Sequence, residues 1–93
     1  MPSIDEQLKA RRIILHPIAS EKAMAMIERE NTITFAVDIE ASKSDVKRAI
    51  EVLYGVEVGD VRTVITHKGY KKAYVRLAEG YSASDLAIRL GMI

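Results

Sequence analysis

The alternation of apolar and polar side chains is clearest in the segment TITFAVDI, residues 32–39. Ile33, Phe35, Val37 and Ile39 occupy every second position, and the residues between them are small or polar. Side chains two residues apart lie on the same face of a strand. The pattern therefore predicts a half-buried strand, with one face in the core and the other toward solvent.

Three further segments have strand character. The apolar run 13–15 ends at His16-Pro17, which predicts a brief edge strand, because proline cannot donate to a sheet ladder. VEVGDVRTVIT (56–66) and KKAYVRLA (71–78) are separated by only four residues. We expect these two segments to pair as an antiparallel hairpin.

Serines precede the three segments in which apolar residues recur at helical spacing. Ser20, Ser42 and Ser82 are expected to be N-caps, and Asn31 and Gly55 stand where the first two helices should end. The expected buried positions are Ala23, Met24 and Ile27 in the first helix, Val46, Ala49, Ile50 and Leu53 in the second, and Leu86, Leu90 and Ile93 in the third.

The predicted order is strand, helix, strand, helix, strand, strand, helix. It indicates an α+β fold, a single-domain sandwich with a mostly antiparallel four-stranded sheet. With 93 residues in total, we expect residues 1–11 to be a flexible or helical N-terminal segment and residues 12–93 to be one domain. The chain has no cysteine, and its N-terminal apolar run is too short for a signal peptide or membrane helix, so we expect a cytoplasmic protein.

Charge is unevenly distributed along the chain, although the net charge is only +1. Residues 38–60 contain six acidic and three basic side chains, whereas residues 61–78 contain five basic and no acidic ones. A run of cations without acidic neighbours is typical of a surface that binds a polyanion. The alternative is a hairpin whose charges only keep it soluble and prevent edge pairing.

On the last strand, alternation places Lys72, Tyr74 and Arg76 on the face opposite the core. These residue types could hold RNA, because arginine and lysine bind phosphate and a tyrosine ring can stack on a base. Lys71 is also expected to project outward with this group, and Arg62 of the preceding strand could extend the surface.

Other chemistry has little support in the sequence. His16 precedes a proline and His67 lies in the expected turn, with no ligand spacing typical of a metal site. There is no glycine-rich phosphate loop, and we expect no cofactor and no small-molecule substrate. A competing hypothesis is a small ferredoxin-like ligand-binding or enzymatic domain, which would require a pocket with a titratable residue placed for chemistry.

Two motifs resemble those of a known family. LHPIASEKA (15–23) is similar to the proline-containing strand end and Ser/Thr-Glu-Lys helix start of the large-ribosomal-subunit protein L23 family. KKAYVRLA (71–78), with Leu86 eight residues further on, resembles the most characteristic signature of that family. The segment between the motifs follows the order and spacing of the family, so the resemblance extends from about residue 12 over most of the chain.

The resemblance implies a structural, non-enzymatic constituent of the ribosome that binds large-subunit ribosomal RNA (rRNA) near the polypeptide exit tunnel. Implied partners are this rRNA, neighbouring large-subunit proteins, the signal recognition particle and the protein-translocation channel. In the family, the glutamate that matches Glu21 lies at the surface where these factors dock. The short connection between the last two strands lacks the long bacterial extension, and a long basic N-terminal extension is also missing. The resemblance is therefore to archaeal members.

Taken together, the residues and the resemblance predict a set of rRNA-binding side chains. They are His16, Lys22, Lys43, Lys47, Arg48, Arg62, His67, Lys68, Lys71, Lys72, Tyr74 and Arg76.

Overall fold

Strands and helices alternate through most of the structure, a computed structural model that describes residues 2–93. In chain order, the elements are α1 (Ile4–Ile13), β1 (Ile14–Pro17), α2 (Glu21–Glu30), β2 (Thr32–Val37), α3 (Lys43–Tyr54), β3 (Val58–Ile65), β4 (Lys71–Leu77) and α4 (Ala83–Arg89). The order predicted from β1 onward is confirmed. Within residues 2–93, no helix combines the length and the apolar character that crossing a bilayer requires.

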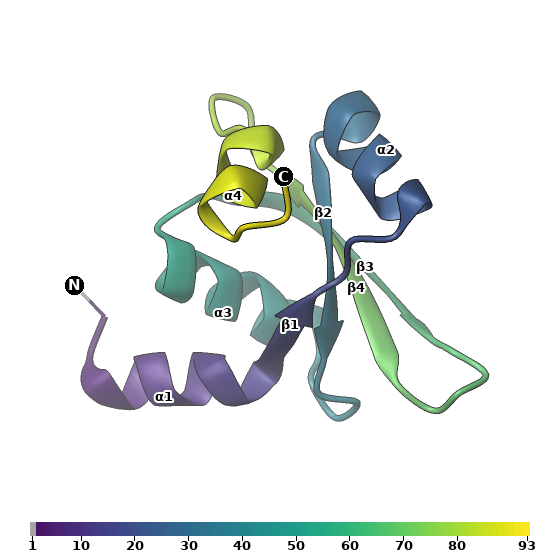
Figure 1. Cartoon of the computed structure of the whole chain (residues 1–93). Helices are drawn as coiled ribbons and strands as arrows, with labels where there is room; N and C mark the ends of the chain where they lie inside the picture. The colour runs from purple at the N-terminus through teal and green to yellow at the C-terminus, as the bar shows by residue number, and fades with distance from the viewer. Residues whose placement is uncertain (1) are drawn as a thin grey trace.

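The four strands form one sheet in the order β1-β2-β4-β3, and all neighbouring strands are antiparallel. The predicted α+β class is therefore confirmed. Figure 1 shows α1, α3 and α4 together on one side of the sheet, while the hairpin of β3 and β4 extends away from them. The helix α2 lies beside the start of β2 and contacts α4.

The predicted helix ends are present. The hydroxyls of Ser20, Ser42 and Ser82 each accept a hydrogen bond from the backbone N–H three residues further on. At the other ends, Asn31 and Gly55 adopt left-handed conformations with φ of 53° and 67°. These local signals work because they satisfy backbone groups that the helix itself leaves without partners.

The core lies between the sheet and the helices. Ile33, Phe35 and Val37 of β2 are buried there, and the ring of Phe35 stacks on Tyr54 with centroids 6.1 Å apart. Helices α3 and α4 contribute Val46, Ala49, Ile50, Ala83, Leu86 and Ala87 to the same cluster. Ile93, which was expected to pack with α4, lies beyond the end of that helix and is exposed.

The prediction that β2 is half-buried is wrong, because both of its faces are covered. Thr32 and Thr34 are each only 1% exposed. β2 is an inner strand, and its short side chains lie directly opposite longer ones on β4, including Arg76 and Tyr74. Polar residues in a strand therefore do not show that a face is exposed. Ile39 lies in the turn after β2 and is 46% exposed.

The N-terminal segment contains α1, which includes Ile13, so β1 begins one residue later than the sequence indicated. Ala10 and Ile13 are buried where α1 packs against α3. β1 is an edge strand, as predicted, and pairs with the second half of β2 through a bulge at residues 14–16.

Candidate nucleic-acid interface

The face of the sheet opposite the core, here called the outer face, carries long polar side chains in cross-strand rows. Ala73, Val75 and Leu77 of β4 are buried, which confirms the alternation predicted for this strand. On the outer face, the register places directly opposite one another Asp60 and Arg76, Arg62 and Tyr74, and Val64 and Lys72.

Acidic groups from other parts of the chain compensate part of the positive charge of residues 61–78, here called the basic segment. Glu30, at the end of α2, has its carboxylate Oε1 3.6 Å from the Arg62 guanidinium. Asp60, just before the basic segment, is the cross-strand neighbour of Arg76. The arginines of this face therefore lie among carboxylates, contrary to what the linear sequence indicated, because the fold brings distant segments together.

On the outer face, toward the end of the sheet away from the hairpin turn, a depression of about 240 Å³ is lined by polar side chains. This polar hollow is formed by Glu30, Thr32, Asp60, Arg62, Tyr74 and Arg76. The Arg62 guanidinium carbon lies 5.6 Å from the centroid of the Tyr74 ring, within the range of a cation–π contact. The hollow thus combines two guanidinium groups, two carboxylates and an aromatic ring.

The tip of the hairpin is more uniformly basic. His67 and Lys68 are exposed in a turn in which the Thr66 N–H donates to the Tyr70 carbonyl. Gly69, with φ of 88°, supplies the left-handed conformation that closes the turn. Neither Lys68 nor the half-buried Lys72 has a salt bridge in the part of the chain that the structure describes.

The expectation that Lys71 points outward with Lys72 and Arg76 is wrong. Lys71 pairs with Val37 in the register and shares the face of Ala73, so its side chain lies on the helix side of the sheet. There its ammonium group donates to the Ala41 carbonyl at 2.7 Å. This lysine therefore ties the start of β4 to the loop before α3.

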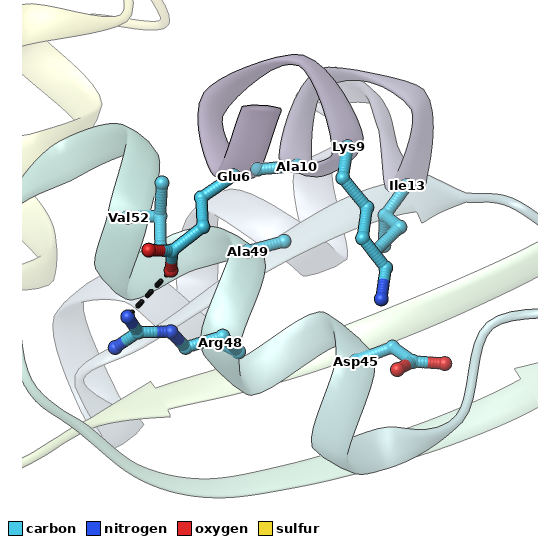
Figure 2. A pocket seen from close by; sticks show the side chains of 8 residues that line it. All are labelled: Glu6, Lys9, Ala10, Ile13, Asp45, Arg48, Ala49 and Val52. Carbon is cyan, nitrogen blue, oxygen red and sulfur yellow. Dashed lines mark hydrogen bonds and ion pairs between the residues drawn. The ribbon is translucent and has the colours of Figure 1, made fainter. Parts of the chain in front are cut away.

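The predicted cations of α3 divide into two groups. Lys43 and Lys47 are exposed, whereas the Arg48 guanidinium donates to the Glu6 carboxylate of α1 at 2.6 Å (Figure 2). That hydrogen bond and charge hold the pKa of Glu6 below its usual value. Lys9 projects from α1 near Asp45, whose pKa is lowered chiefly by hydrogen bonds with Ser42.

His16, Glu21 and Lys22 are exposed where β1 leads into α2. The His16 Nδ1 lies 2.9 Å from the Pro17 carbonyl oxygen. His16 also lines a shallow groove of about 500 Å³ whose far wall includes Tyr70 of the hairpin turn. The fold therefore brings His16 and the hairpin together, a proximity that the sequence did not indicate.

Sequence reasoning missed Glu30 and Asp60 as members of the site. The only available signal was the position of Asp60 at the boundary of the basic segment, one residue before Val61. Glu30 gave none, because its place beside Arg62 depends on how α2 meets the sheet. Among residues 2–93, no group of three or more histidine or carboxylate side chains is arranged to hold a metal ion.

Comparisons with known proteins give a consistent result. The family described as "Ribosomal protein L23" matches residues 12–84. A protein named "Large ribosomal subunit protein uL23" from the archaeon Methanococcus aeolicus is 49% identical over 80 residues, which cover 86% of this chain and 93% of that protein. The match contains β1 through β4, the outer face and the hairpin, while most of α1 precedes the family region.

Proposed function

Because this chain belongs to the ribosomal protein L23 family and is of the archaeal type, we propose that it binds rRNA through its outer face, its hairpin tip and the exposed lysines of α3. It is a ribosomal protein of the large subunit and not an enzyme. We infer its RNA contacts, its place in the subunit and its docking partners from the geometry and from the family resemblance.

The observation that carries the proposal is a group of four exposed or half-buried lysines without salt bridges within residues 2–93. Two lie in or next to the hairpin turn and two on α3, namely Lys68, Lys72, Lys43 and Lys47. Lys9 and Lys22 share this property but lie on α1 and α2. Without an acidic partner, each of the four lysines can neutralise a phosphate and release its condensed counterion. His67 in the same turn and His16 beside it add polar contacts at this end of the molecule.

A titration of an rRNA fragment against salt tests this proposal. Lys68→Ser/Lys72→Ser should weaken binding at low salt and reduce the log–log salt slope by roughly 0.7 to 0.9 for each phosphate that the variant leaves without a neutralising cation. Arg11→Ser/Arg12→Ser, which removes two exposed cations from α1, is the control for the same change in net charge. Affinity that is insensitive to salt, or equal effects of the hairpin and control variants, would contradict an interface at the hairpin.

We place the protein near the exit tunnel of the cytoplasmic ribosome, beside neighbouring large-subunit proteins. Because the turn between β3 and β4 is short, we do not expect the hairpin to contact the tunnel wall. Glu21 and Lys22 lie in the exposed first turn of α2, on a different element from the hairpin tip. This separation supports a docking role for Glu21 toward the signal recognition particle and the translocation channel.

Glu21→Gln should therefore weaken binding of the signal recognition particle to ribosomes while the protein still assembles into the large subunit. Co-sedimentation of the particle with variant ribosomes measures the first effect, and the amount of protein in purified subunits measures the second. Glu28→Gln, an exposed carboxylate later in α2, is the matched control. Lost assembly would instead assign Glu21 a structural role.

A further inference from the structure

The polar hollow differs in charge from the hairpin tip. Its two carboxylates, Glu30 and Asp60, balance the two guanidinium groups of Arg62 and Arg76. A phosphate entering the hollow would meet repulsion from the carboxylates as well as attraction from the arginines. The hollow is therefore better suited to a neutral group that presents both hydrogen-bond donors and acceptors.

The ionic groups of the hollow are available to a ligand. Glu30 and Arg62 are separated by 3.6 Å, and their side chains are 53% and 58% exposed. An exposed pair of this kind contributes little to stability, so its rearrangement costs little. Asp60 has no salt bridge among residues 2–93, and it lies directly across from Arg76.

A flat surface borders these charges. The Arg62 guanidinium carbon lies over the Tyr74 ring, 5.6 Å from its centroid, and both groups are of the kind on which RNA bases stack; the pair is here called the Arg62–Tyr74 platform. Beside Tyr74 in the cross-strand register is Thr34, whose buried hydroxyl has no hydrogen-bond partner among residues 2–93. The platform thus rests on an inner strand of the sheet.

We propose that the polar hollow binds one unpaired guanine base of the RNA, an inference that rests on the proposed function. The Asp60 carboxylate accepts hydrogen bonds from guanine N1–H and N2–H, and the Arg76 guanidinium donates to O6 and N7. The base stacks against the Arg62–Tyr74 platform. Guanine alone among the four bases presents two adjacent donors on its Watson–Crick edge, as a carboxylate requires.

Fluorescence anisotropy with short uridine-rich RNA tests this assignment. The central position is guanine, adenine, cytosine or hypoxanthine, the last of which lacks the exocyclic N2 donor. We expect guanine to bind about tenfold more tightly than adenine or cytosine, with hypoxanthine intermediate. Asp60→Asn should reduce this preference and remove the difference between guanine and hypoxanthine, because an amide has only one acceptor oxygen, while the Arg76 contact to O6 and N7 remains. Asp5→Asn on α1 is the matched control.

The outcomes separate this inference from the proposed function. Equal binding of all four oligonucleotides, or a preference for guanine over hypoxanthine that survives Asp60→Asn, overturns the guanine site even when rRNA binding remains salt-dependent. If the unmodified protein binds none of the RNAs in a salt-dependent manner, the proposed function is overturned instead. A thermal melt of Asp60→Asn, expected to match that of the unmodified protein, excludes unfolding as the cause of a lost preference.

Discussion

At the scale of single residues, Asn31 joins three segments of the chain. Its left-handed backbone ends α2, and its carbonyl accepts from the Leu77 N–H at 3.1 Å. Its side-chain amide donates to the Tyr81 carbonyl at 2.8 Å, and its side-chain oxygen accepts from the Ala83 N–H at 2.7 Å. A residue identified from sequence as a helix end thus also fixes the turn that leads into α4.

Asn31→Gly separates these roles, because glycine adopts the left-handed conformation readily but has no side chain to donate or accept. We expect it to lower the free energy of unfolding by about 1–3 kcal/mol, the range for losing two or three partly buried hydrogen bonds. Urea denaturation measures the change. Asn31→Asp keeps the acceptor for Ala83 but loses the donor for Tyr81. Its free energy of unfolding should therefore lie between those of the unmodified protein and Asn31→Gly. Unchanged stability of Asn31→Gly would show that only the backbone conformation matters.

At the scale of elements, the sequence predicts those features that depend on neighbours along the chain. Ser42 and Gly55 mark the ends of α3 because capping is a local interaction, and the hairpin follows from two strands joined by a short turn. The alternation on β4 likewise identifies Tyr74 and Arg76 as outward residues. These predictions require no knowledge of what packs across the sheet.

Features that depend on distant segments could not be predicted in this way. The loop residue Ala41 provides the carbonyl that holds Lys71, and no pattern near Lys71 indicates that contact. Thr34 looks like a solvent-facing strand residue but is covered, since β2 is an inner strand. Glu30 joins the polar hollow through the position of α2. The sequence therefore predicted the basic surface but not the carboxylates within it.

At the scale of the whole molecule, α1 lies mostly outside the family match but is packed onto the matched part of the chain. Most of its residues precede the family match, which begins at residue 12. Ala10 packs toward Ala49 and Val52 of α3, and the Glu6–Arg48 ion pair closes one end of a small depression of about 130 Å³ between the helices (Figure 2). The contact occupies Arg48, one of the predicted RNA-binding residues.

Removing residues 2–11 should leave the remaining domain folded but lower its free energy of unfolding by about 1–3 kcal/mol, since apolar side chains of α3 become exposed.

The Glu6–Arg48 ion pair adds an effect that should depend on pH. Because the folded state lowers the pKa of Glu6, its stabilising effect is present above the ordinary carboxyl range and disappears as pH falls through the lowered pKa. Glu6→Gln should therefore destabilise the protein at neutral pH and have no effect at strongly acidic pH. Thermal melts of the three proteins across this range measure both parts, with Asp5→Gln as the control on the same helix. A truncated chain as stable as the full one would show that α1 is only loosely attached, and a pH-independent effect of Glu6→Gln would exclude the ion pair as its cause.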